Sequence, residues 1–158
     1  MTTPSSSQSS SPQPFARIAI GVDFSGSADH ALQLARARFP GAERLLVHVV
    51  DLAASALPDV SGAGLIPITS TPRLIQELSD IDKRRLDGIT QPGESQQLVT
   101  GDPAVGLIEA ARAWNADLIV VGTHHQGAIE HFFSGSVAES VVKRSPLPVL
   151  VIRSDARR

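Results

Sequence analysis

Residues 117–139 read DLIVVGTHHQGAIEHFFSGSVAE, an apolar run followed by a glycine-bounded loop and the start of a helix. Leu118 to Val121 are apolar at consecutive positions, which is typical of a strand buried on both faces of a parallel sheet. Ser136-Val137-Ala138-Glu139 matches the capping box, in which the serine and glutamate side chains each accept a hydrogen bond from the other residue's backbone N–H. We therefore predict a strand over Asp117–Gly122 and a helix from Ser136 to about Arg144.

The same alternation of short β-branched runs and helically spaced segments recurs from Arg17 onward. Repeated βα units of this kind build a parallel sheet with helices on both faces. The other predicted strands are Arg17–Val22, Arg44–Val50, Gln96–Thr100 and Val149–Arg153. The other predicted helices are Ala28–Arg38, about Pro72–Asp87, and one that begins after Asp102, a capping residue followed by proline. The predicted fold is α/β: a single-domain three-layer sandwich with a five-stranded, mainly parallel, open twisted sheet.

Two segments lie outside this pattern. Residues 1–14 hold serine, threonine, proline and glutamine without a charge, and we predict a disordered tail ahead of one domain over residues 15–155. The segment from Leu52 to Ser70 is predicted to be a long connection between the second strand and the second helix. The apolar stripe of that helix comprises Leu74, Leu78, Ile81 and Leu86.

Composition excludes several classes of protein. The chain has 158 residues, 14 basic and 16 acidic, with a net charge of -2, and its basic residues are scattered, which argues against nucleic-acid binding. It has no cysteine, so disulfides, thiolate catalysis, iron-sulfur clusters and cysteine-ligated zinc are excluded. Residues 1–15 lack the basic start and apolar stretch that are typical of a secretory signal, and the apolar runs of the chain are too short to cross a bilayer. We expect a cytoplasmic protein with no membrane partner.

Common nucleotide and hydrolase motifs are also missing. Neither Gly101–Gly106 nor Gly122–Gly127 continues into the Lys-Ser or Lys-Thr of a P-loop. The glycines of Gly62-Ala63-Gly64 fall in a connection and do not form the dinucleotide fingerprint, and Gly-x-Ser-x-Gly is absent. The loop histidines lack an acidic partner at diagnostic spacing, so we predict no metal site. His48, inside a strand, is predicted to be a hydrogen-bonded structural residue.

In parallel α/β sheets, ligands bind beyond the carboxyl ends of the strands. The loop from Gly122 to Ser136 suits an anion there, because glycine permits close backbone approach and a helix start offers free amides. Asp23 follows the first strand, where its carboxylate can accept hydrogen bonds from a ribose or simply close a turn. Val49 can face an adenine ring or belong to the core. Ser136 can cap its helix, bind a phosphate, or do both.

Taken together, these residues resemble the universal stress protein family, a group of adenine-nucleotide alpha-hydrolase-like α/β folds. The resemblance covers nearly everything after the tail. It is carried by Ile18–Ser25, Leu46–Val50, Gly101-Asp102-Pro103, Val121–Val142 and Pro146–Val151.

Nucleotide-binding members of the family carry glycine, two residues, glycine, nine residues, then glycine followed by serine or threonine. Gly122, Gly135 and Ser136 match this pattern, and His125 replaces its second glycine. The imidazole of His125 can crowd a polyphosphate or hydrogen-bond it. The set of nucleotide-binding residues that the resemblance implies is Gly21, Val22, Asp23, Val49, Val121, Gly122, His125, Gly135, Ser136 and Val137.

The resemblance implies a regulatory stress-response protein that binds ATP or AMP, with or without Mg²⁺, and is not an enzyme, weak ATP hydrolysis being left open. It also implies a homodimer formed through Val149–Arg153, and an unpaired apolar edge strand favours this independently. Two alternatives stay open. One is a stress-linked interaction protein that has lost nucleotide binding through His125. The other is a slow ATPase that uses Asp23 and the loop histidines.

Overall fold

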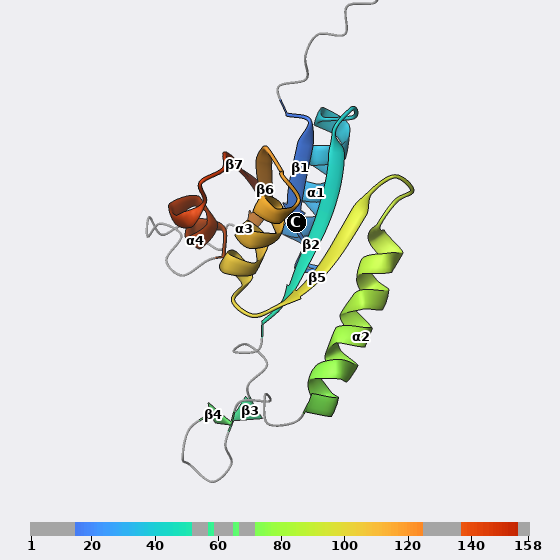
Figure 1. The fold of residues 1–158 in the computed structure, drawn as a ribbon, viewed down its shortest axis with the longest axis vertical. Coiled ribbons are helices and arrows are strands. Elements are labelled where there is room, and N and C mark those ends of the chain that lie inside the picture. The colour runs from blue at the N-terminus through green and yellow to red at the C-terminus, as the bar shows by residue number, and fades with distance from the viewer. Residues whose placement is uncertain (1–14, 52–56, 59–64, 67–71, 125–136, 155–158) are drawn as a thin grey trace, which may run out of the picture.

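The chain folds into one parallel sheet with helices on both faces (Figure 1). The computed structural model describes residues 15–51, 57–58, 65–66, 72–124 and 137–154. The sheet has the strand order β5-β2-β1-β6-β7, and every neighbouring pair in it is parallel. Its strands are β1 (Arg17–Gly21), β2 (Glu43–Val50), β5 (Ser95–Thr100), β6 (Leu118–His124) and β7 (Val149–Ser154). The helices are α1 (Gly26–Arg38), α2 (Pro72–Ile89), α3 (Pro103–Ala113) and α4 (Val137–Arg144).

The predicted α/β architecture is confirmed, and the differences lie at element ends. Helix α1 begins at Gly26, ahead of the predicted Ala28, because Ser25 caps it and accepts a hydrogen bond from Ala28 N at 3.2 Å. Helix α3 begins as predicted, with Asp102 accepting a hydrogen bond from Val105 N at 2.8 Å. Helix α4 ends at Arg144 as predicted, whereas Ser136, which we predicted to cap it, lies outside the described residues.

Two further predictions differ from the structure, one about the segment after β2 and one about the end of β6. The segment Leu52–Ser70 contains a pair of short antiparallel strands, β3 (Leu57–Pro58) and β4 (Leu65–Ile66), where we predicted only a connection. The strand predicted to end at Gly122 continues to His124. Its pairing with β7 extends to His124 opposite Ser154, which keeps these last residues in the sheet.

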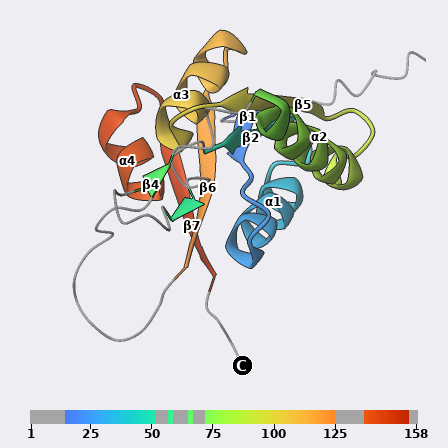
Figure 2. The same cartoon turned by 90° about the horizontal axis from the view of Figure 1, so that it is seen from below.

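Two apolar cores fill the space between the sheet and its helices. Helices α3 and α4 pack on one face of the sheet, and α1 and α2 pack on the other (Figure 2). The first core joins Ala19, Leu45, Val47 and Ile119 to Leu107, Ala111 and Val141. The second joins Ile18, Ile20, Leu46 and Val120 to Ala31, Leu32, Ala35 and Leu86. The central strands are thus buried on both faces, as their consecutive apolar residues predict.

In the predicted apolar stripe of helix α2, Leu78 is half-buried, and Ile81 alone among the described side chains departs from the pattern. Leu86 is buried, but Ile81 is 47% exposed. Asp82, the residue after Ile81, is half-buried and contacts His48 of β2. Asp82 thus makes a polar contact with β2 from the inward side of the helix, while Ile81 faces outward.

A buried carboxylate ties three elements together at the amino edge of the sheet. The Glu94 side chain is 1% exposed and accepts hydrogen bonds from Arg36 of α1 at 2.6 Å and Arg44 of β2 at 2.9 Å. Gln91 N donates a further bond to it at 2.9 Å. Burial alone would raise the pKa of Glu94, but the hydrogen bonds from Arg36, Gln91 and Arg44 outweigh it and lower that pKa to about 2. We call Arg36, Arg44 and Glu94 the Glu94 clamp.

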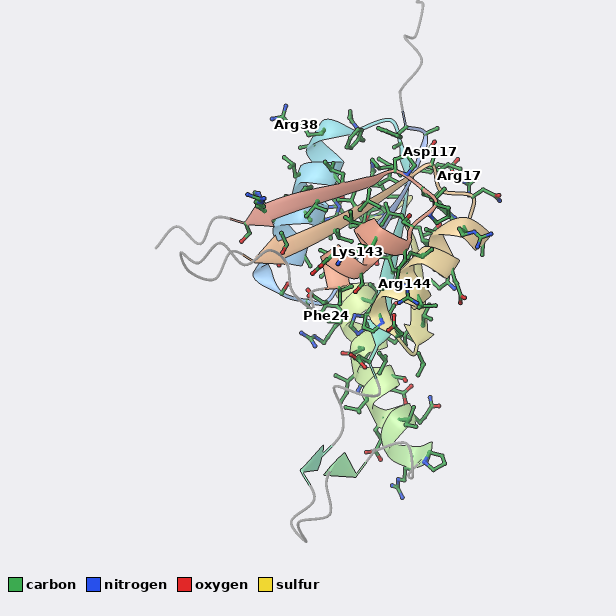
Figure 3. The ribbon with its side chains drawn as sticks, turned by 90° about the vertical axis from the view of Figure 1, so that its left-hand side faces the viewer. Arg17, Phe24, Arg38, Asp117, Lys143 and Arg144 are labelled. Carbon is green, nitrogen blue, oxygen red and sulfur yellow. The ribbon has the colours of Figure 1, made fainter. Side chains whose placement is uncertain are left out.

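The same amino edge is also fixed by Asp117, which accepts hydrogen bonds from Ala16 N at 2.8 Å and Arg17 N at 3.2 Å. The Arg17 guanidinium lies 4.2 Å from the ring centroid of Trp114. Figure 3 labels Arg17 and Asp117 at this end of the molecule, and Phe24 farther along it, near α2. Among the described helices, none is both long and apolar enough to cross a membrane.

Candidate functional site

A cavity of about 390 Å³ lies at the carboxyl ends of β1, β2 and β6. Its volume is within the range of about 300–1,000 Å³ that is typical of small-molecule sites. The described residues that line it are Gly21, Val22, Asp23, Ala28, Val47, His48, Val49, Val50, Asp51, Leu78, Asp82, Pro103, Leu107, Val121, Gly122, Val137 and Ala138. The cavity therefore occupies the edge of the sheet at which a ligand is expected in this fold.

Every predicted site residue that the structure describes lines this cavity. These residues are Gly21, Val22, Asp23, Val49, Val121, Gly122 and Val137. They come from β1, β2, β6 and α4 and from the residues after β1, so segments far apart in the sequence meet at one place. The other predicted residues, His125, Gly135 and Ser136, lie outside the described residues.

Two glycines bring helices close to the cavity. A Cβ atom on Gly122 would lie 2.3 Å from the backbone carbonyl oxygen of Ser27, in the first turn of α1. A Cβ atom on Gly21 would lie 2.9 Å from Leu107 Cδ2 of α3. Gly122 is therefore required by the packing of α1 against β6, whether or not it also approaches a ligand.

For Asp23 and Val49 the sequence left two roles open, one structural and one at the ligand site, and the structure is compatible with both. Asp23 is exposed, and its Oδ1 accepts hydrogen bonds from the backbone N–H of Ser25, at 2.9 Å, and from the Ser25 hydroxyl. It therefore forms the predicted turn and also lines the cavity. Val49 is half-buried and packs closely against Gly106 of α3. A Cβ atom added to Gly106 would lie only 3.1 Å from a methyl group of Val49. Val49 thus belongs to the core and to the cavity wall.

Three helices contribute residues of their first turn to the cavity wall. Ala28 lies in the first turn of α1, Pro103 begins α3, and Val137 begins α4. The amino end of a helix carries partial positive charge and unpaired N–H groups, which favour an anion. None of the described lining residues is a lysine or an arginine. Attraction for an anion on this part of the wall therefore rests on backbone groups.

The wall differs in charge from one side to the other. Asp51, Asp82 and His48 lie on the side formed by β2 and α2. Gly122 and Val137 lie on the side formed by β6 and α4. Carboxylates accept hydrogen bonds from hydroxyl and amino groups, whereas a glycine strand end beside a helix start suits a phosphate. The cavity can therefore hold the neutral and anionic parts of one ligand at opposite ends.

His48 and Asp82 are site residues that the sequence analysis did not identify. The prediction that His48 is hydrogen-bonded is confirmed: Nδ1 lies 2.6 Å from the Val22 carbonyl oxygen and Nε2 lies 3.2 Å from Asp82 Oδ2. Both residues also line the cavity. A signal for Asp82 was available, because it lies four residues after Leu78 and four before Leu86, on the same helix face as both.

The described part of the chain contains no cluster of side chains that could bind a metal ion. No group of three or more His, Cys, Asp or Glu side chains is placed there to hold an ion. The three aspartates at the cavity do not form such a group, and Asp82 is engaged by His48 and by Arg85 Nη1, at 3.4 Å.

Comparison with known proteins points to a single family. Residues 14–153 match the sequence model of the Universal stress protein family. A universal stress protein of Thermus aquaticus, encoded in the 3' region of a QAH/OAS sulfhydrylase gene, is 34% identical over 142 residues, which is 88% of this chain and 99% of that protein.

Solved structures with the same fold include proteins with a bound nucleotide. A universal stress protein family protein of Arabidopsis thaliana with AMP bound aligns with a TM-score of 0.53 and 18% identity, over 89% of this chain and 93% of that one. A universal stress protein in complex with cAMP aligns with a TM-score of 0.51 and 21% identity, over 87% of this chain and 96% of that one.

Proposed function

This chain belongs to the universal stress protein family, and on that basis we propose that it binds an adenine nucleotide, ATP or AMP, in the cavity at the carboxyl edge of its sheet. The observation that carries the proposal is that every described residue of the family-implied set lines this one cavity. The nucleotides in the AMP-bound and cAMP-bound relatives share an adenosine monophosphate unit and support the same class of ligand.

The two ends of the cavity suggest the orientation of the nucleotide. Asp23 and Asp51 offer acceptors for ribose hydroxyls or the adenine amino group, and Val49 and Leu78 offer apolar surface for the ring. The phosphates then lie toward Gly122 and Val137, away from the carboxylates and near the amino end of α4. In this orientation, the net charge of -2 is no obstacle to an anionic ligand.

The nucleotide acts in this proposal as an effector and not as a substrate with rapid turnover. A ligand that binds one conformation more tightly than another shifts the population toward it, and a change in partner contacts follows. The first test is to denature the purified protein, chromatograph any released nucleotide, and measure unfolding with added ATP or AMP. A ligand at a hundredfold excess over its Kd stabilises the fold by about 2.7 kcal/mol. Absence of both bound nucleotide and stabilisation would favour the interaction protein that has lost nucleotide binding.

A bulky side chain at the mouth of the cavity is expected to block the ligand. Val137 lines the cavity, and because it is 45% exposed, Val137→Trp can be accommodated at the surface without disturbing the core. We expect Val137→Trp to weaken AMP binding by about tenfold or more, equivalent to about 1.4 kcal/mol, as measured by titration calorimetry.

The matched control is Val142→Trp on the same helix. Val142 is 52% exposed and is not among the residues that line the cavity. Its replacement should leave the affinity for AMP within about twofold of the unchanged protein. Equal affinities for both tryptophan variants would place the ligand elsewhere.

We further propose that two copies pair through β7. This strand is at the edge of the sheet, and its Leu150 is 36% exposed. Ile119 N donates to the Pro148 carbonyl oxygen at 2.9 Å, so alternation along the strand directs the backbone groups of Val149 and Val151 away from β6. These groups, beside an exposed apolar side chain, are available to a second β7 strand.

Sedimentation measurements can test this pairing. Leu150→Lys should raise the dimer dissociation constant by about tenfold or more, because twofold symmetry brings the new charges of both copies to the same interface. Ile81→Lys is the control, since Ile81 is 47% exposed on α2, which packs against β2 and β5, away from the β7 edge. A dimer that survives Leu150→Lys unchanged, or a protein that is already monomeric, would refute pairing through β7.

A further inference from the structure

Four side chains beside the cavity form a closed ring of contacts, which we call the His48 clasp: Phe24, His48, Asp82 and Arg85. The Phe24 ring lies 4.5 Å from the His48 ring, and the Arg85 guanidinium lies 4.0 Å from the Phe24 centroid. Arg85 Nη1 lies 3.4 Å from Asp82 Oδ1, and Asp82 Oδ2 lies 3.2 Å from His48 Nε2. Figure 3 labels Phe24 beside α2.

The clasp joins three elements that form one wall of the cavity. Asp82 and Arg85 belong to α2, His48 belongs to β2, and Phe24 belongs to the segment between β1 and α1. Phe24 has a φ of 60°, a conformation that is uncommon for a large side chain, and its ring contacts on both sides hold it there. Val22, Asp23, His48 and Asp82 all line the cavity, so the clasp determines where this wall stands.

The hydrogen bonds of His48 require two protons on its ring. Nδ1 faces the Val22 carbonyl oxygen, which can only accept, so Nδ1 must carry a hydrogen. Nε2 faces the Asp82 carboxylate, which also accepts when ionised. Both bonds exist together only for the imidazolium ion. Loss of a proton leaves the bond to Val22 in place and points the lone pair of Nε2 at the carboxylate, which breaks the contact with α2.

Within the described residues, few charged groups surround the imidazole of His48. Asp82 and Arg85 reach it from α2, Asp23 lies after β1, and Asp51 lies after β2. Leu98, the partner of His48 on β5, carries no charge. Histidine is a side chain that proteins use as a proton-dependent switch, and the contact with Asp82 depends on whether the His48 ring carries its second proton.

We propose that His48 and Asp82 are positioning residues that couple protonation to ligand affinity: the imidazolium holds α2 against the cavity, and its deprotonation loosens that wall. The effect on affinity rests on the proposed function, whereas the clasp itself does not. A ligand binds more tightly to a cavity whose wall is already ordered than to one whose wall becomes ordered only on binding. The affinity for the nucleotide should therefore fall as the pH rises.

The variant that isolates this step is Asp82→Asn. An asparagine amide can accept a bond from a ring N–H or donate one to a ring nitrogen, so it pairs with either form of His48. Asp80→Asn is the control, because Asp80 is an exposed carboxylate on the same helix and bonds only Gln76 among the contacts the structure describes for it. The phosphate of AMP itself titrates, so the measured quantity is the ratio of AMP dissociation constants, variant over unchanged protein, at each pH.

For Asp82→Asn we expect this ratio to fall by about fivefold or more between about pH 5.5 and pH 8.5, and for Asp80→Asn to stay within about twofold. Thermal unfolding without nucleotide gives a second measurement. The unchanged protein should unfold about 4 °C above Asp82→Asn at the lower pH, and this difference should disappear or reverse at the higher pH. This sign follows because the hydrogen bond from Nε2 to Asp82 needs the second ring proton, and a lower pH favours its uptake.

The outcomes separate the two proposals. If AMP fails to bind at any pH, the proposed function and the effect on affinity are both overturned, and the unfolding difference alone decides whether the clasp depends on protonation. If AMP binds with a constant ratio and the unfolding difference does not change with pH, the clasp is overturned while nucleotide binding stands.

Discussion

Glu94→Gln is expected to lower the free energy of unfolding by about 3 kcal/mol, because it leaves two arginines of the Glu94 clamp without their anion. The side chains of Arg36 and Arg44 are 12% and 18% exposed, so water can replace only part of what they lose. Glutamine keeps the size of the side chain and removes its charge, which separates the ion pairs from packing. Urea unfolding with a common m-value would measure the loss.

The same clamp predicts how stability depends on acid. The pKa of Glu94 falls from its ordinary value of 4.5 to about 2 in the folded chain. A lowered pKa means that the stabilisation is complete above pH 4.5 and is lost as the pH falls toward 2, a contribution of about 3 kcal/mol. The difference between the unchanged protein and Glu94→Gln should shrink over that interval.

The control for the clamp is Glu43→Gln. Glu43 is 67% exposed and lies 3.6 Å from Arg17, in a surface ion pair. Its replacement should cost less than about 0.5 kcal/mol. A cost for Glu94→Gln as small as this would mean that Arg36 and Arg44 reach solvent freely once the carboxylate is gone.

Gly122→Ala is expected to lower the free energy of unfolding by about 3 kcal/mol, as measured by urea unfolding. It should also abolish AMP binding, as measured by titration calorimetry. The added methyl would meet the carbonyl oxygen of Ser27 at 2.3 Å and Ala28 N at 2.8 Å. These are backbone atoms in the first turn of α1, so relief requires the helix to move away from β6. Because Gly122 and Ala28 both line the cavity, that movement changes the shape of the site.

Gly88→Ala provides the comparison for this substitution. Gly88 is a helical residue of α2, and a Cβ atom added to it would meet nothing within 4 Å. Alanine is the better helix former, so this variant should gain about 0.5 kcal/mol. If Gly122→Ala kept its stability and its affinity for AMP, α1 would have to be free to move, contrary to its close contact with β6.

The architecture was predictable because its signals are local. Leu118–Val121 is apolar at every position, and Asp102-Pro103 marks a helix start through backbone groups of the same turn. The end of β6 was not predictable in this way, because it depends on pairing with β7, which lies far along the chain. Strands of two residues, such as β3 and β4, are too short to leave a periodic pattern.

The cavity was predictable in outline and not in its details. The carboxyl ends of the strands and the resemblance to a known family point to Gly21, Asp23 and Gly122. The pairing of His48 with Asp82 joins residues 34 positions apart, and it depends on how α2 rotates against the sheet. The apolar stripe predicted the burial of Leu86 correctly and that of Ile81 wrongly.

The two edges of the sheet differ in composition. At the β5 edge the strand begins Ser-Gln-Gln, and Gln96 is held by Thr90 and Asp87 at the end of α2. At the β7 edge the strand begins Val-Leu-Val. A sheet with two adhesive edges can add copies without limit and grow into a fibre. If copies pair through β7 as proposed, assembly through the sheet ends with two copies, and the polar β5 edge disfavours further growth of the pair.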